Sequence, residues 1–404
     1  MELSEMLLSL VAIWIAAKIG GELAERFGQP AVLGELLGGV VVGKHMLGLV
    51  HEDEFLILLA HIGVIILLFE VGLETDLFGL LRVGPRSVTV AALGMIVPMA
   101  GGYFVSRALG LEIPAALLIG GALSATSIAI ATRTLSDLGE NSSDEGRIVV
   151  GAAVLDDLLA LVVLGILTQL AHEGTVTVSF AALAAGKAVM FLLLAIVLGR
   201  LFAKPLLGMV DRMTVRGALV TFSLSAALTL AICAQQIGSA AIIGAFAAGV
   251  VLAGTHRIRA IEQELKPIAS VFTPVFFVMI GASLDLTVLN PLDPANHGAL
   301  LLTGVIVTVA LAGKLISGLG AWGKGIRRGM IGASMAPRGE VMLVFAEVGR
   351  EAGILGHSAF AALVVTVFVT AIVSPMLITW FARRDARSDG SAKEQKQRMA
   401  DARA

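Results

Sequence analysis

The residues that promise chemistry in this sequence are charged side chains in apolar surroundings. Asp156 and Asp157 stand side by side in the otherwise apolar run 151–167, and Lys314 stands in a second such run. A charge at the centre of a lipid bilayer costs roughly 2.5–3.5 kcal/mol on insertion scales, so function must justify its presence there. Because adjacent helical residues point in different directions, we expect one carboxylate to bind a cation and the other to face Lys314.

A second set of candidates lies where two apolar runs are interrupted by polar residues. Residues 124–127 read SATS, and residues 334–340 read SMAPRGE. Pro337 has no amide donor and disfavours helix at the preceding residue, which predicts a helix break; a simple proline kink is the alternative. Unwound backbone is tolerated within a membrane where it is buried in protein or lines a cavity. The broken helix ends need compensating charges, for which Arg338 and Glu340 are candidates.

Three other titratable groups occur in apolar runs, namely Glu35, Glu70 and His61. Both carboxylates lie near predicted run ends, which favours structural roles, and Glu70 is kept as an additional acidic site. Histidine titrates near neutral pH, but a lone histidine usually makes a local hydrogen bond. The sequence has no phosphate-binding loop or HExxH motif, and its only cysteine is Cys233. We therefore expect neither an enzyme nor a bound cofactor.

The composition indicates a membrane protein. Of the 404 residues, 57% are hydrophobic and 15% are charged, whereas soluble domains have about 45–50% apolar and about 25% charged residues. The surplus apolar surface must face lipid, so the fold class is an all-α polytopic membrane protein whose partner is the bilayer. A net charge of −2 gives no basic surface for nucleic acid.

Reading apolar runs of about 20 residues against charged loops predicts thirteen transmembrane helices. Most of the 29 Lys and Arg residues follow odd-numbered runs, which places the N-terminus outside and the C-terminus in the cytoplasm. The runs lie near 5–20, 30–49, 56–73, 88–106, 114–134, 148–170, 179–199, 217–236, 240–254, 267–284, 299–320, 329–349 and 358–382.

An internal repeat relates the two halves of the chain. AVLGELLGGVVVGK at 31–44 matches AIIGAFAAGVVLAG at 241–254, and GLETDL at 72–77 matches GASLDL at 281–286. The matches pair runs separated by seven spans, an odd shift, so the second copy is inverted, as is typical of secondary transporters. The expected transporter domain, 1–382, comprises repeat one (about 5–170), a linker helix (about 179–199) and repeat two (about 217–382), followed by a disordered tail, 383–404.

In their order and spacing, several motifs resemble those of the cation–proton antiporter superfamily, in particular its bacterial sodium/proton antiporters with an Asp-Asp pair. The resemblance implies inverted repeats of six helices with two crossed discontinuous helices. It also implies a homodimer, each protomer with a scaffold and a mobile core, in the bacterial cytoplasmic membrane, serving pH homeostasis. The motifs are QPAVLGE (29–35), LLFEVGLE (67–74), ATS (125–127), GAAVLDD (151–157), GK (313–314) and MAPRGE (335–340).

The same resemblance implies roles for individual residues. Asp157 resembles the aspartate that binds the ion and the proton, and Asp156 resembles its neighbour that pairs with the lysine, here Lys314. Thr126 and Ser127 resemble the unwound segment beside the transported Na⁺, which with the two aspartates would form the ion site. The Asp-Asp pair resembles the electrogenic branch of the family.

Two further positions qualify this assignment. Glu340 resembles a carboxylate of the core near the second crossing, next to Pro337 and Arg338 of the second break. Glu70 departs from many relatives, which have an apolar residue there, and raises the question of an additional protonatable site.

Three functions remain open at this level. The first is exchange of Na⁺, or Li⁺, for H⁺. The second is a K⁺/H⁺ antiporter or a potassium efflux component of the same fold, although such efflux relatives commonly carry a nucleotide-binding domain after the last span, where this chain has only the tail 383–404. The third is a passive channel or a membrane sensor, which the carboxylate pair, the lysine and the inverted broken helices disfavour.

Overall fold

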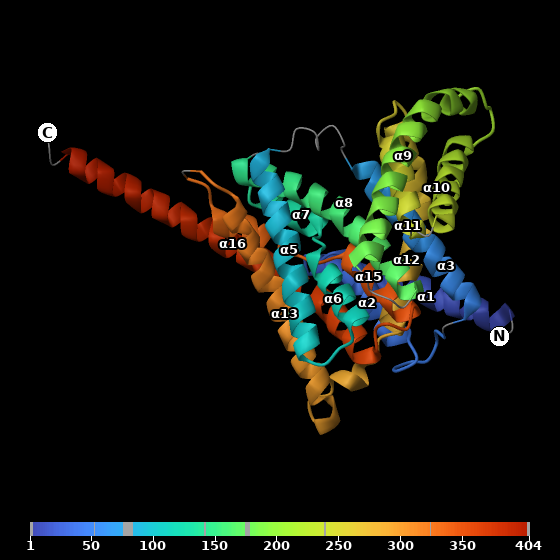
Figure 1. Ribbon diagram of the computed structural model, residues 1–404, viewed down its shortest axis with the longest axis horizontal. Helices are drawn as coiled ribbons and strands as arrows, with labels where there is room; N and C mark the ends of the chain where they lie inside the picture. Colours follow the sequence, from blue (N-terminus) through green and yellow to red (C-terminus); the bar gives the residue numbers. More distant parts are fainter. Residues whose placement is uncertain are drawn as a thin grey trace.

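The computed structural model is a bundle of helices (Figure 1). It describes residues 3–401, apart from residues 52, 76–83, 141–142, 174–177, 238–239 and 324. Regular structure within these residues is entirely helical. The all-α class predicted from the sequence is therefore confirmed. The last two residues of the repeat motif at 72–77 lie outside the described residues.

The helices follow one another along the chain with short connections. Local signals set several starts: the Asp53 carboxylate accepts the Leu56 amide at 2.7 Å before α3, and Pro85 opens α5. The helices are α1 (Leu3–Arg26), α2 (Ala31–Val42), α3 (Glu54–Glu74), α5 (Pro85–Ala108), α6 (Ile113–Ser124), α7 (Ile128–Asp137), α8 (Asp144–Glu173), α9 (Val178–Val210), α10 (Ala218–Gln236), α11 (Ala241–Ala253), α12 (Ile258–Ala282), α13 (His297–Ser317), α14 (Arg328–Ser334), α15 (Glu340–Glu351) and α16 (His357–Asp401).

Ten helices in the described part of the chain are long and apolar enough to cross a membrane, with α6 and α7 counted as one. The shorter apolar helices α2 and α11 and the pair α14–α15 occupy the other predicted positions. The number of thirteen spans therefore stays a prediction.

Two regions differ from the sequence-based expectation. The second run, expected near 30–49, forms a helix of only 12 residues, because α2 starts after Pro30 and the chain turns away at Gly43. The ninth run, expected near 240–254, agrees with the 13 residues of α11. The segment after Arg383 continues α16 to Asp401 and extends away from the other helices, where a disordered tail was expected (Figure 1). Its Ala, Lys, Glu, Gln and Arg residues are strong helix formers, which explains the continuation.

The packing divides the helices into two groups (Figure 1). Helices α1–α3 and α10–α12 pack mainly against one another and form what we call the scaffold group. Helices α5–α8 and α13–α16 do the same and form the core group, with α9 in contact with both. Each group therefore combines helices from both halves of the sequence.

Glycine permits close approach between helices within the scaffold group. A Cβ atom added at Gly34 of α2 would collide with the backbone at Gly20 of α1, and one added at Gly249 of α11 would collide with the backbone of α3. Backbone-to-backbone packing of this kind is typical of membrane helices, where no hydrophobic driving force holds helices together.

Candidate functional site

Two interrupted helices meet in the middle of the core group. Helix α6 ends at Ser124 and α7 begins at Ile128, while α14 ends at Ser334 and α15 begins at Glu340. Both interruptions lie where the sequence predicts them. The second is a break with extended backbone, not a simple proline kink.

The two unwound segments bind each other directly. The Ser127 amide donates a hydrogen bond to the Pro337 carbonyl at 2.8 Å, and the Thr126 hydroxyl oxygen lies 3.3 Å from the Met335 carbonyl. At Gly339 an added Cβ would stand 2.7 Å from the Ser127 hydroxyl oxygen. Each segment thus satisfies part of the other's backbone, which a membrane interior requires.

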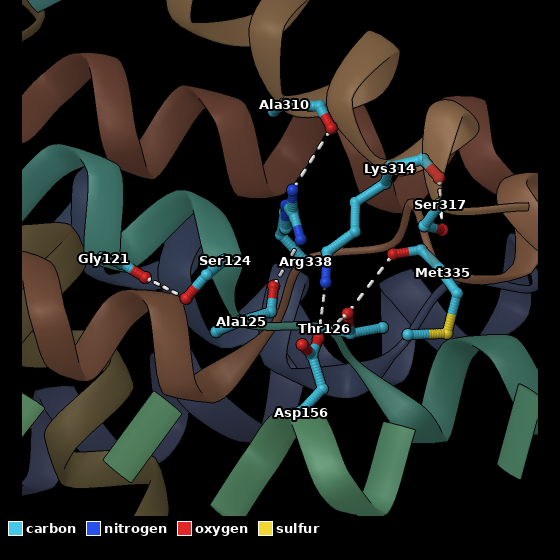
Figure 2. Close-up of polar contacts among 10 residues, drawn as sticks. All are labelled: Gly121, Ser124, Ala125, Thr126, Asp156, Ala310, Lys314, Ser317, Met335 and Arg338. Atoms are coloured by element: carbon cyan, nitrogen blue, oxygen red, sulfur yellow. Dashed lines mark hydrogen bonds and ion pairs between the residues drawn. The ribbon is translucent and has the colours of Figure 1, made fainter. Parts of the chain in front are cut away.

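A buried ion pair lies beside this crossing (Figure 2). The Lys314 ammonium, reaching from α13, donates to Oδ2 of Asp156 on α8 at 2.5 Å, and the Thr126 hydroxyl donates to the same oxygen at 2.5 Å. The exposed fractions are 0% for Lys314 and 1% for Asp156. The structure therefore brings the expected counter-charge and the expected unwound segment to the same carboxylate.

Arg338 is also fully buried, but it binds carbonyl groups (Figure 2). Its guanidinium donates to the Ala125 carbonyl at 2.5 Å and to the Ala310 carbonyl at 3.2 Å. Ala125 directly follows α6, whose C-terminal end carries a partial negative charge that a cation stabilises. Glu340 is the first residue of α15, where the partial positive charge of a helix N-terminus favours a carboxylate.

Asp157 occupies the next position of α8 and has a different environment. Its side chain is half-buried, and its Oδ1 atom accepts no hydrogen bond from the residues that the structure describes. The charged groups that act on it are Glu340, Asp156 and Lys314. Asp157 and the half-buried Glu340 repel each other, and uptake of either a cation or a proton relieves this repulsion.

The remaining sequence candidate, Glu70, is not part of this cluster. It lies on α3 in the scaffold group, where its charged neighbours are Glu74 on the same helix and Glu262 and Lys266 on α12. Glu74 in turn repels the carboxylate of Glu340 electrostatically.

Several residues that support the site carry no chemical signal in the sequence. Gly94 of α5 leaves room for the lysine, since a Cβ there would stand 3.3 Å from the Lys314 ammonium. The Thr370 hydroxyl of α16 accepts the Arg338 amide at 3.2 Å. Ala310 contributes only its backbone. Such roles depend on tertiary contacts, which a residue type alone does not reveal.

Comparison with protein families assigns this architecture. The family model described as "Sodium/hydrogen exchanger, transmembrane" matches residues 8–384. The chain belongs to the sodium/hydrogen exchanger family. The resemblance inferred from the motifs is thereby confirmed, and the match extends over both helix groups.

Individual members of this family are similar over most of their length. The high-affinity Na⁺/H⁺ antiporter NhaS3 of Synechocystis is 39% identical over 92% of this chain and 89% of its own. The Na⁺/H⁺-K⁺ antiporter GerN of Bacillus cereus is 33% identical over 94% of this chain and 97% of its own.

A third curated relative and a solved structure extend the comparison. The glutathione-regulated potassium-efflux protein KefC of Klebsiella pneumoniae is 29% identical over 94% of this chain but only 61% of its own. The sodium proton antiporter MjNhaP1 of Methanocaldococcus jannaschii superposes with a TM-score of 0.69 at 18% identity, covering 95% of this chain and 98% of its own, and so shares the fold.

Proposed function

We propose that this exchanger moves Na⁺ in one direction and H⁺ in the other by alternating access, with Asp157 as the group that binds both. The observation that carries the proposal is the unequal treatment of two neighbouring aspartates. Asp156 is buried, neutralised by Lys314 and hydrogen-bonded by Thr126, while Asp157 is half-buried and is repelled by a second carboxylate, Glu340. Asp157 is therefore the carboxylate that meets an incoming cation or proton first.

Coupling follows from competition at Asp157. A cation binds the ionised carboxylate, and a proton neutralises it, so the two occupants exclude each other. Thr126, Ser127 and Asp156 would complete the ion site, since their oxygens lie on the unwound segment and on the adjacent turn of α8. The other parts of the site, Pro337, Arg338 and Glu340, hold the second break in place.

The exchange is electrogenic in this proposal. If the entering cation draws Asp156 away from Lys314, the ammonium is left buried and unpaired, and releasing its proton removes that cost. More than one proton then moves per cation. An inside-negative potential of 100 mV contributes about 2.3 kcal/mol per net charge moved and so drives the exchange.

The test is cation-driven dissipation of a pH gradient in proteoliposomes of the purified protein. Asp157→Asn should abolish the signal while the protein still folds. Glu22→Gln serves as the matched control, because Glu22 is an exposed carboxylate with 58% of its side chain accessible. If Asp157→Asn exchanges ions at the rate of the wild type, Asp157 is not the group that binds the cation and the proton.

A second measurement separates electrogenic from one-for-one exchange. Sodium-driven proton movement is compared with the potential clamped by valinomycin and potassium and with the potential free to build. Clamping should accelerate exchange, and a sodium gradient should itself generate a potential. Equal rates without a potential would establish electroneutral exchange.

Exchange of K⁺ for H⁺ is the second candidate, favoured by the relative GerN, whose name includes K⁺. Comparing Na⁺, Li⁺ and K⁺ in the same vesicles decides between them. A response to K⁺ alone would replace the sodium assignment. Glu70→Gln, in the same assay, tests whether Glu70 is an additional protonatable site.

We further propose a homodimer in the bacterial cytoplasmic membrane that serves pH homeostasis. The excess of basic residues after odd-numbered spans supports an outer N-terminus and a cytoplasmic C-terminus. Protease accessibility of tags at the two termini in intact cells tests the orientation, and mass measurement in native lipid tests the oligomer.

A further inference from the structure

One histidine bridges the scaffold and core groups outside the ion site. His61 of α3 places Nε2 3.2 Å from a carboxylate oxygen of Glu351, the last residue of α15. Its other ring nitrogen, Nδ1, lies 2.9 Å from the Ile57 carbonyl. The pair therefore joins a scaffold helix to the half-helix that begins at the crossing.

The geometry of these two contacts specifies a protonation state. A backbone carbonyl and an ionised carboxylate only accept hydrogen bonds, whereas a neutral imidazole carries a single N–H. Both bonds of His61 can form together with ionised Glu351 only when both ring nitrogens are protonated. Loss of one proton turns a nitrogen lone pair toward an acceptor, and one of the two contacts must break.

The pair is partly exposed at the surface of the bundle and is remote from the ion site. The exposed fractions of the side chains are 49% for His61 and 35% for Glu351. Along α15, Glu351 lies about 16 Å from Glu340, at 1.5 Å per residue. Histidine is also the side chain whose charge ordinarily changes between about pH 5 and pH 8.

The charged surroundings of His61 come mainly from α15. Glu347, one turn before Glu351, also acts on the ring, and Arg350 binds Glu347 at 2.7 Å. The helices α10 and α11 that pack on α3 contain no Asp, Glu, Lys, Arg or His. The acid nearest the N-terminal end of α3 itself is Glu54, and the acid at the N-terminal end of the neighbouring α1 is Glu5. The charged residues of α12 lie at 259–266, at the opposite end of the bundle from His61.

We propose that His61 and Glu351 form a second proton-binding site, separate from the transport site, that acts as a latch between scaffold and core. The inference rests on the proposed alternating access, in which the two groups move relative to each other. In the proposed orientation the N-terminal end of α3 and the C-terminal end of α15 face outside. Protons from the outside therefore close the latch and oppose opening toward that side.

The transport test uses right-side-out vesicles with saturating Na⁺ on both sides, so that protons compete weakly at Asp157. Exchange of labelled Na⁺ is followed while the outer pH changes between about 5 and 8 at constant inner pH. Because the ion pair is exposed and therefore weak, acidification should slow exchange by about two- to fivefold. His61→Gln and Glu351→Gln should each abolish this component and retain the rate of the wild type at alkaline pH.

His45→Gln is the matched control. His45 contacts Asp285 at 3.7 Å toward the same end of the bundle, but His45 lies between scaffold helices α2 and α3, and Asp285 stands three residues after the end of scaffold helix α12. Its pH response should equal that of the wild type. A wild-type response in both His61→Gln and Glu351→Gln overturns the latch while leaving the proposed exchange intact.

A second measurement does not depend on transport. In a double-mutant cycle on thermal unfolding, His61→Gln and Glu351→Gln should couple at acid pH and become additive at alkaline pH. Additivity at both pH values overturns the latch, whether or not the vesicles show Na⁺ exchange. The absence of Na⁺ exchange in the vesicles would instead refute the proposed function.

Discussion

Removing one partner of the Asp156–Lys314 pair should destabilise the protein far more than removing an exposed charge. In Lys314→Met, the Asp156 carboxylate stays in an interior position with an exposed fraction of 1% and keeps Thr126 as its described donor. Breaking a buried pair in this way costs about 3–5 kcal/mol. Asp156→Asn should cost somewhat less, because the amide oxygen still accepts from Thr126 and from the ammonium.

The double variant Asp156→Asn/Lys314→Met should recover much of this loss. No charge remains at these two positions, and the hydrogen bond between Thr126 and residue 156 persists. We expect the double variant to be more stable than the sum of the single changes predicts by at least about 2 kcal/mol, which is the scale of a hydrogen bond to a charged group.

The assay is thermal unfolding of the purified protein in one detergent, for the wild type, both single variants and the double variant. The control cycle uses Glu22 and Arg26, which form a 2.9 Å pair with exposed fractions of 58% and 71%. Its coupling should be no more than about 0.5 kcal/mol. Additive effects at 156 and 314 would refute the reasoning, since they would mean that burial of the pair contributes no shared energy.

Three further changes test the surroundings of the site. Gly339→Ala should lower the melting temperature and slow transport because its methyl group would stand 2.7 Å from the Ser127 oxygen, and adding Ser127→Gly should restore part of the melting temperature. Arg338→Lys should lower the melting temperature by the equivalent of about 2–3 kcal/mol, because one ammonium cannot reach carbonyls on two helices as the guanidinium does. The hydrogen bonds from Arg327 hold the pKa of Glu140 below its usual range, so this pair stabilises the fold above about pH 4.3 and loses that effect as the pH falls. Glu140→Gln should therefore cost about 1 kcal/mol at neutral pH, and the difference in melting temperature from the wild type should shrink on acidification.

The sequence predicts those parts of the structure that depend on the cost of charge and of broken backbone in a membrane. The helical class, the two interruptions and the proximity of Lys314 to Asp156 all follow from this cost. What the sequence does not reveal depends on shape: Gly94 matters through the space it leaves, and Ala310 through a carbonyl whose direction only the packed helices determine. The contact of His61 with Glu351 joins residues 290 positions apart, so no local pattern indicates it.

The site separates charges that stay fixed from charges that can change partner. Arg338 binds the carbonyls of Ala125 and Ala310, so its interactions hold the end of α6 next to α13. Lys314 instead depends on Asp156, a carboxylate that an incoming cation also attracts. In the proposed exchange, a cation in the site changes the environment of the lysine while the arginine keeps the crossing intact. Ions are then exchanged at the centre of the core group while the two unwound segments stay in place.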